Sequence, residues 1–343
     1  MKQPLSALGV ACPVLAAPMS GGPMTPALVA AAARAGSMGF LAGGYKTPAL
    51  LQQQIAEVRE QTPVFGVNLF APNPVPVDRE EFRRYAAAVQ AEAAQYGLQL
   101  DGTDPVENDD AWSAKVGLLV SDPVPVVSFT FGLPGQSVVT ALKRAGTLII
   151  QTVTSAEEAR LAAAAGADAL AVQALTAGGH CGTWTPQRMP AAVPLPELTA
   201  SVTDATGLPV VAAGGVSTPA EVTAVLRAGA DAVMVGTALL RSDESGASAV
   251  HQAAIADPGR SPTVITRAFS GRPARGLENA FTRKYSELAP LGYPAIHYLT
   301  SGLRKAAAAA GNPELVHLWA GTGYRNAATG PAGTILTSLA STA

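Results

Sequence analysis

The sequence predicts a (β/α)8 barrel, also called a TIM barrel, with a smaller and mainly helical cap. Short apolar segments alternate eight times with alanine-rich segments of helical period, which is the order of elements in such a barrel. The short segments are almost continuously apolar, as strands of a parallel sheet covered on both faces must be. At 343 residues the chain exceeds the roughly 250 residues of a typical barrel, which leaves room for a cap.

The predicted strands and helices follow one another with recognisable ends. The strands are Pro13–Met19, Met38–Gly43, Phe65–Phe70, Val124–Phe131, Leu148–Val153, Ala169–Ala174, Pro209–Ala213 and Ala232–Val235. The helices are Pro26–Ala35, Pro48–Glu60, Asp78–Tyr96, Gly135–Arg144, Ser155–Ala165, Leu195–Ala205, Pro219–Ala228 and Ser245–Ala256. Ser155 and Thr218 suit N-caps, and Gly166 and Gly229 suit left-handed helix ends. Because strand order cannot be read from one sequence, a doubly wound sheet stays open as the alternative.

Two regions fall outside the repeated pattern. Residues from about 71 to 122 contain proline-rich and acidic stretches around one helix, and residues after about 257 form no further strand–helix unit. Leu303–Ala310 and Pro313–Trp319 have helical patterns. These regions predict a cap over the mouth of the barrel. The expected division is a barrel of residues 1–75 and 120–262, with a cap of residues 76–119 and 263–343.

The composition excludes several classes of protein. Hydrophobic residues make up 48% of the chain and charged residues 14%, so the chain buries a large core and is not disordered. A net charge of −2 and an aromatic content of 5% provide neither a basic face nor a stacking platform for nucleic acid. The two cysteines, Cys12 and Cys181, suit a reducing compartment. We expect a cytoplasmic monomer or homodimer.

The stretch between Lys2 and Arg34 carries no charge, a feature also found in export signals and membrane spans. Prolines and glycines interrupt it. Its longest clean apolar run, Val14–Ala17, has the length of a strand and falls far short of the roughly 20 residues of a spanning helix. We interpret the stretch as a buried strand, a loop and a buried helix, and expect no membrane association.

Glycine-rich loops follow the last two predicted strands. Gly214 and Gly215 come after the seventh strand, and Gly236 and Thr237 after the eighth. Barrels often bind phosphate with these two loops, because glycine lets the backbone approach closely and turn N–H groups toward an anion. The loops therefore predict a phosphate site. Neither a G-x-G-x-x-G fingerprint nor a P-loop lysine is present, so a Rossmann dinucleotide site or an ATP site is not favoured.

His180 is the candidate catalytic residue, because among the 4 histidines it alone lies in a glycine-rich loop after a strand. An imidazole there can exchange a proton near neutral pH or, as imidazolium, hold an anion. We expect His251 at the surface, and His297 and His317 in the cap, with His297 able to reach the site. Neighbours on an extended loop usually point apart, so no dyad of Cys181 with His180 is expected. No residues have metal-ligand spacing.

The strand-end motifs form an ordered set over nearly the whole chain. They are Ala17–Gly22, Phe65–Phe70, Val127–Gly132, Gln173, Ala177–Gly182, Ala212–Gly215, Val235–Ala238, Phe269–Gly276 and Trp319–Gly323. This set resembles the nitronate monooxygenases, formerly called 2-nitropropane dioxygenases, and in particular their class I branch. Each motif is weak by itself, but the set is specific. The resemblance implies an FMN-dependent barrel enzyme.

The resemblance also implies roles for individual residues. His180 would deprotonate a neutral nitroalkane or orient an anionic nitronate such as propionate 3-nitronate, and O2 would complete the cleavage to a carbonyl compound and nitrite. The flavin carries the difficult step and the protein supplies position and electrostatics. The implied FMN-binding residues are Met19, Asn68, Gln173, Gly178, Gly179, Gly214, Gly215, Met234, Val235, Gly236 and Thr237.

Two other functions use the same kind of barrel. The first is an FMN-dependent reductase that takes hydride from NAD(P)H to a quinone or an enoyl thioester. The second is an aldolase or isomerase acting on a sugar phosphate, which commonly needs a lysine at a strand end; none of the predicted strand ends carries one. Thr176 and Ala174 stand where the resembling family often has glutamate and glycine, which bears on the substrate.

Overall fold

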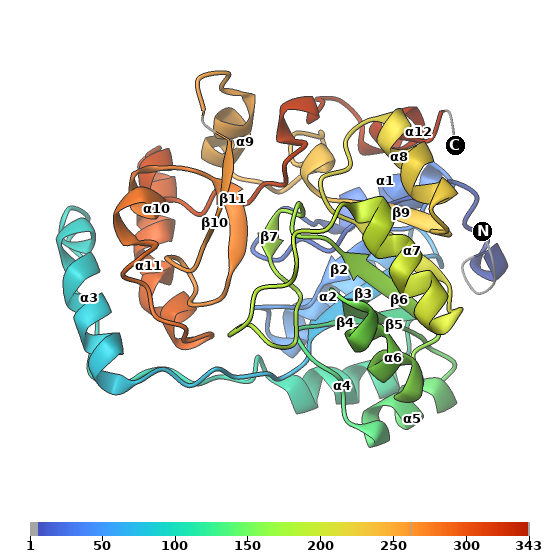
Figure 1. Ribbon diagram of the computed structural model, residues 1–343, viewed down its shortest axis with the longest axis horizontal. Helices are drawn as coiled ribbons and strands as arrows, with labels where there is room; N and C mark the ends of the chain where they lie inside the picture. The colour runs from blue at the N-terminus through green and yellow to red at the C-terminus, as the bar shows by residue number, and fades with distance from the viewer. Residues whose placement is uncertain (1–5, 261, 342–343) are drawn as a thin grey trace.

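The computed structural model describes residues 6–260 and 262–341 of the chain. Within them, a parallel sheet of 8 strands runs in the order β1-β9-β8-β6-β5-β4-β3-β2. A parallel bridge between Ala16 and Gly39 joins the two ends of this order, and the amide of Ala16 donates to the carbonyl of Met38 at 2.9 Å. The sheet is thereby closed into a barrel with helices around it (Figure 1). The predicted (β/α)8 barrel is confirmed, and the doubly wound alternative is wrong.

Each predicted strand contains one observed strand. The barrel strands are β1 (Val14–Ala16), β2 (Phe40–Ala42), β3 (Gly66–Phe70), β4 (Val126–Thr130), β5 (Leu148–Val153), β6 (Ala169–Gln173), β8 (Val210–Ala213) and β9 (Ala232–Val235). Nearly all of their residues are buried, as the continuous apolar pattern requires. Their carboxyl ends meet at one mouth of the barrel.

Six predicted helices also lie on the barrel. They are α1 (Pro26–Arg34), α2 (Pro48–Arg59), α5 (Gln136–Arg144), α6 (Ala156–Ala164), α7 (Leu195–Thr206) and α8 (Pro219–Arg227). Their starts follow from local chemistry. The Ser155 side chain accepts from the amide of Glu158, and Thr218 forms a capping box with Glu221, so free amides of the first turn are bonded.

Two further helices complete the barrel, and the sequence pattern did not assign either of them to it. The helix α4 (Trp112–Ser121) precedes β4 and packs on the barrel through Leu119. The helix α12 (Ala332–Leu339) lies beside α1 and α8 (Figure 1) and packs its Ile335 and Leu336 into the barrel core. The expectation that the C-terminal region lies wholly in the cap is therefore wrong for α12, because its apolar face covers β1.

The eighth predicted helix has a different neighbour from the expected one. The helix α9 (Ala249–Ala256) packs Ala254 and Ile255 into the cap core instead of the barrel core. An apolar stripe predicts that one face of a helix is buried, but not the surface that buries it. The numerical boundaries between barrel and cap remain a prediction, and residues 1–5, 261, 342 and 343 of those ranges lie outside the described residues.

The cap combines helices with a small sheet. Besides α9, its helices are α3 (Arg79–Ala94), α10 (Ala280–Tyr285) and α11 (Ala295–Ala309), and its sheet has the order β10 (Thr263–Thr266), β11 (Ala274–Leu277) and β7 (Gly179–His180). Short 3-10 helices are Ser6–Leu8, Thr237–Leu239, Pro313–Leu315 and Tyr324–Asn326. The strand β7 belongs to the loop after β6, so the cap sheet reaches back to the barrel mouth and holds His180 there.

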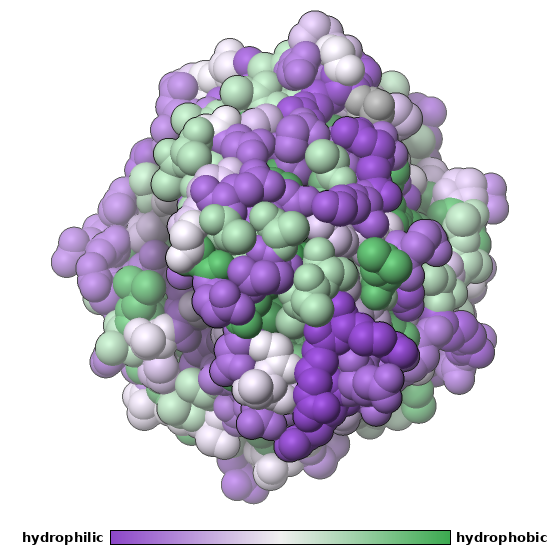
Figure 2. Space-filling model, turned by 90° about the vertical axis from the view of Figure 1, so that its left-hand side faces the viewer, coloured by the Kyte–Doolittle hydropathy of each residue, from purple (hydrophilic) through white to green (hydrophobic). Residues whose placement is uncertain are grey.

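The outer face of the cap differs from its interior. Leu299, Leu303, Phe269 and Phe281 pack inside it. On the outside, hydrophilic residues predominate and hydrophobic ones form small separate groups (Figure 2). Within the described residues no helix combines the length and the apolar character needed to cross a bilayer.

Candidate active site

A cavity of about 690 Å³ lies at the carboxyl ends of the barrel strands, between the barrel and the cap. Such a volume is within the range of cofactor and ligand sites. Every residue predicted for the site lines it: His180 together with Met19, Asn68, Gln173, Gly178, Gly179, Gly214, Gly215, Met234, Val235, Gly236 and Thr237. The structure thus brings the whole predicted set together around one cavity.

One end of the cavity is a cradle of bare backbone. Gly215 has φ +73°, and a Cβ built on it would lie 2.5 Å from Thr322 Oγ1. A Cβ on Gly178 would lie 2.5 Å from the amide nitrogen of Gly321. This amide donates to Thr237 Oγ1 at 2.9 Å. The loops after β6, β8 and β9 therefore pack against a C-terminal loop, with no room for a side chain at Gly178 or Gly215, and such exposed backbone suits an anion held by main-chain N–H groups.

Two amide side chains brace the barrel mouth. Asn68 Nδ2 donates to Ser128 Oγ at 2.9 Å and to Thr130 Oγ1 at 3.0 Å. Gln173 Nε2 donates to the carbonyl of His180 at 3.2 Å, and Gln173 Oε1 accepts from the amide of Gly182 at 2.6 Å. Because Gln173 holds the chain on both sides of residue 181, it fixes the loop that carries His180.

His180 sits in an aromatic enclosure. Its ring centroid is 5.5 Å from that of Trp319, 5.8 Å from Tyr293 and 5.9 Å from Phe131. Its Nε2 lies 2.8 Å from Ser270 Oγ. Burial, assisted by the positive charges of two arginines, lowers the pKa of His180 to about 3. The imidazole is therefore neutral at pH 7, the protonation state in which its ring nitrogen has a free lone pair.

Those two arginines are Arg272 and Arg304, and both are buried. The Arg304 Nη2 donates to the carbonyl of His297 at 2.8 Å, and its Nε donates to Thr300 Oγ1 at 3.1 Å. The Arg272 guanidinium lies 3.9 Å from the centre of the Phe131 ring and donates to the carbonyls of residues 181 and 183. Burial lowers the pKa of each arginine to about 10, so both remain cations at pH 7.

The cavity wall carries positive charge without a matching carboxylate. Arg304 and Lys305 line it, and within the described residues no aspartate or glutamate does. Buried cations are usually paired. An uncompensated cation facing a cavity therefore favours an anionic ligand.

The remaining histidines lie nearer the site than expected. His251, predicted at the surface, is 7% exposed and lines the cavity, with its Nε2 3.0 Å from the carbonyl of Trp319. The expectation was wrong because α9 turns toward the cap. His297 and His317 also line the cavity, and burial holds their pKa values well below the ordinary range.

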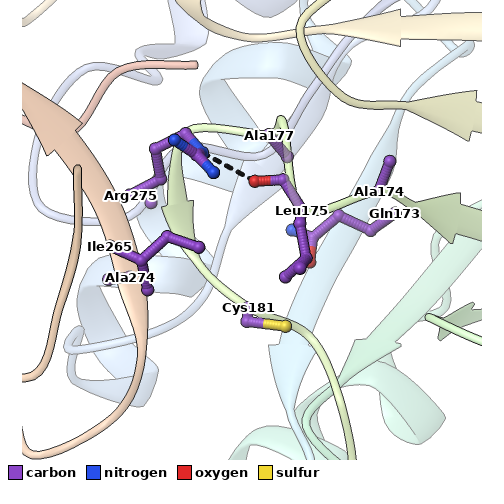
Figure 3. Close-up of a pocket in the computed structure, with 9 residues that line it drawn as sticks. Gln173, Ala174, Leu175, Ala177, Cys181, Ile265, Ala274 and Arg275 are labelled. Carbon is purple, nitrogen blue, oxygen red and sulfur yellow. Dashed lines mark hydrogen bonds between the residues drawn. The ribbon is translucent and has the colours of Figure 1, made fainter. Parts of the chain in front are cut away.

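Cys181 faces away from the cavity that His180 lines. It borders a separate small pocket with Leu175, Ile265 and Arg275, in which Arg275 Nε donates to the carbonyl of Leu175 at 2.6 Å (Figure 3). Burial raises the pKa of the Cys181 thiol. Since the two neighbours open onto different pockets, the expected absence of a Cys–His pair agrees with the geometry.

Sequence reasoning missed the cap side of the site. Ser270, Arg304, Trp319 and Tyr45 were not among the predicted site residues, although Ser270 and Trp319 fall within the Phe269–Gly276 and Trp319–Gly323 motifs. Those motifs were a usable signal. Arg304 and Tyr45 gave none, because nothing in the sequence predicts how α11 and the loop after β2 meet.

A barrel whose strand ends open on a large, enclosed cavity with a neutral histidine and bare glycine loops defines a barrel enzyme. Comparison with known proteins specifies the class further. A family model described as nitronate monooxygenase matches residues 2–342. A probable nitronate monooxygenase of Staphylococcus aureus is 35% identical over 339 residues, covering 97% of this chain and 94% of the relative.

Solved structures agree with this match. A nitroalkane oxidase from Streptomyces ansochromogenes is similar with a TM-score of 0.92 and 46% identity, over 98% of this chain and 97% of that one. FabK from Thermotoga maritima is similar with a TM-score of 0.76 and 26% identity, over 99% and 95%. The chain belongs to the nitronate monooxygenase family and is an oxidoreductase.

Proposed function

We propose that the protein is an FMN-dependent nitronate monooxygenase. It oxidises alkyl nitronates, such as propionate 3-nitronate, or nitroalkanes with O2 to a carbonyl compound and nitrite. One observation carries the proposal: a single cavity joins a glycine cradle to a neutral, enclosed His180 beside the unpaired cation of Arg304. The family membership and the likeness to a nitroalkane oxidase support it.

The residues present fit FMN. Gly178, Gly179, Gly214, Gly215, Gly236 and Thr237 would hold the phosphate with main-chain N–H groups and a hydroxyl, and at Gly178, Gly214 and Gly215 the neighbouring atoms leave little space for a side chain. Met19, Asn68, Gln173, Met234 and Val235 would contact the remainder of the cofactor along the strand ends. Bound FMN would supply the redox chemistry of the reaction between the substrate and oxygen.

His180 and Arg304 act on the substrate. The neutral imidazole of His180 accepts the proton on the carbon next to the nitro group of a nitroalkane, and its Ser270 contact fixes the ring. A nitronate has already lost that proton, so His180 then only orients it. The positive charge of Arg304 attracts the nitronate anion, and the surrounding aromatic rings exclude water.

Anaerobic mixing tests the proposal. We expect the yellow, FMN-loaded protein to bleach on addition of propionate 3-nitronate, and nitrite to form once air is admitted. Rapid bleaching by NADH or NADPH without bleaching by a nitronate would instead establish the reductase alternative. A colourless protein that cannot be reconstituted with FMN would exclude both. We expect the enzyme to act in the cytoplasm as a monomer or homodimer, and light scattering of the purified protein tests the oligomeric state.

A further inference from the structure

We propose that Asp110 is a positioning residue for the cap side of the active site. Its carboxylate, held by the buried ammonium of Lys115, fixes the backbone of Tyr45. Tyr45 in turn holds α11, which carries Arg304, over the cavity. The kinetic part of this inference rests on the proposed function.

The first observation is that three non-glycine residues in this region have left-handed backbone conformations. Tyr45 has φ +63°, Asp110 φ +60° and Ala111 φ +53°. Non-glycine residues rarely adopt this left-handed region, and they persist there only where surrounding contacts over-determine the backbone. Phe131, with φ +82°, is the other described non-glycine residue with a positive φ, and it also lines the cavity.

The second observation is the network that supplies those contacts. Asp110 Oδ1 accepts from the backbone N–H of Tyr45 at 3.0 Å, and Asp110 Oδ2 lies 2.7 Å from Lys115 Nζ. The Lys115 side chain is 1% exposed and belongs to α4, a helix of the barrel. A buried ammonium strongly requires its anion. Lys115 therefore anchors the Asp110 carboxylate to the barrel, and the carboxylate anchors Tyr45.

The third observation connects Tyr45 to the cap. Its ring stacks on that of His297, with centroids 4.0 Å apart and planes 6° apart. Its hydroxyl accepts from the Tyr293 hydroxyl at 3.1 Å. The carbonyl of His297 accepts from Arg304. The chain of contacts from Lys115 thus ends at the cation that faces the cavity.

The position of this network predicts which kinetic constant it controls. His180 is held by hydrogen bonds with Ser270 and Gln173, and it meets the Asp110 network only at the ring of Tyr293, 5.8 Å away. Because these two hydrogen bonds do not depend on Tyr45, loss of the Tyr45 anchor should displace α11 and Arg304 more than His180. We expect weaker binding of a nitronate, with little change in the step that follows binding.

Two double variants isolate the contact. Asp110→Asn with Lys115→Met, and Asp110→Ala with Lys115→Met, both remove the buried charge pair. They differ in whether residue 110 retains an oxygen that can accept from the Tyr45 N–H. Each is compared with the unmodified FMN-loaded protein by hydrogen exchange of residues 295–309, by FMN content, and by kcat and KM for propionate 3-nitronate.

We expect the Asn-containing variant to keep the exchange rates and KM of the unmodified protein. The Ala-containing variant should exchange faster in residues 295–309 and raise KM about fivefold, the effect of one lost hydrogen bond, with kcat and FMN content unchanged. Equal behaviour of the two variants would overturn the proposal, as would a fall in kcat with unchanged KM. If the unmodified protein fails to oxidise nitronate, the proposed function fails, whereas the exchange comparison still decides the positioning role.

Discussion

At the loops after β8 and β9, the barrel side of the cavity is lined by main chain and small residues, whereas the cap side is lined by aromatic, cationic and imidazole side chains. The barrel side comes from the ends of strands such as β8 and β9, where Gly215 and Gly236 lie. The cap side comes from segments far apart in the sequence, including Tyr45 and Arg304. The difference separates two tasks, since bare backbone suits a fixed phosphate and side chains suit a variable substrate.

The largest effect is expected on the barrel side. Gly215→Val should abolish FMN retention, because a Cβ at φ +73° would lie 2.5 Å from Thr322 Oγ1 and would displace the loop that we propose holds the phosphate. The measurement is bound FMN per protein after gel filtration. Gly146→Val is the matched control, since Gly146 has φ +85° and no heavy atom within 4 Å of a built Cβ. Equal FMN content in both variants would show that the phosphate lies elsewhere.

The next largest effect is expected at His180, which lies between the barrel side and the cap side of the cavity. His180→Asn should retain the yellow cofactor but lower kcat for a neutral nitroalkane by about 10²-fold or more, the usual contribution of a general base. Turnover of a preformed nitronate should fall much less, because that substrate needs no proton removed. Nitrite release from both substrates measures the ratio. If kcat fell by the same factor with both substrates, His180 would not act by abstracting a proton.

The barrel half was predictable from the sequence and the cap half was not, for a physical reason. Strand ends such as Asn68 and Gln173 converge because a closed parallel sheet places them at one mouth, so local pattern fixes their position. Whether α9 and α12 cover the barrel or the cap depends on contacts with segments distant in sequence. An amphipathic stripe carries no such information, and for this reason His251 was misplaced.

Dependence on contacts between distant segments also explains two backbone conformations that the sequence pattern did not predict. Tyr45 and Phe131 adopt positive φ values without being glycine. Such conformations are stabilised by tertiary contacts, here the carboxylate of Asp110 for Tyr45, and local propensity disfavours them. Departures of this kind concentrate at functional sites, which agrees with both residues lining the cavity.

A smaller effect is expected when one positive charge on the cap side of the cavity is removed. Arg304→Met keeps most of the buried volume and removes the cation, so KM for a nitronate should rise about tenfold, the effect of a lost hydrogen bond to a charged group. KM for a neutral nitroalkane should change little. Steady-state kinetics with the two substrates measure this difference. Arg144→Met, at an exposed position, is the control for removing one positive charge, and a matching rise in that variant would assign the effect to net charge.

The last expected effect is on the stability of the fold instead of on catalysis, and it comes from two buried histidines that line the cavity. Burial lowers the pKa of His180 to about 3 and of His251 to about 4, while an unfolded histidine titrates near 6.5. The unfolded chain then binds protons that the folded one excludes, so stability is full above pH 6.5 and falls as the pH drops toward 4. At pH 5 the loss in the free energy of unfolding should be about 2 kcal/mol for each of the two histidines.

Urea unfolding at pH 7 and pH 5 measures this loss. His251→Gln should remove one histidine's share of the pH dependence, and an unchanged dependence in that variant would show that His251 does not remain neutral on folding.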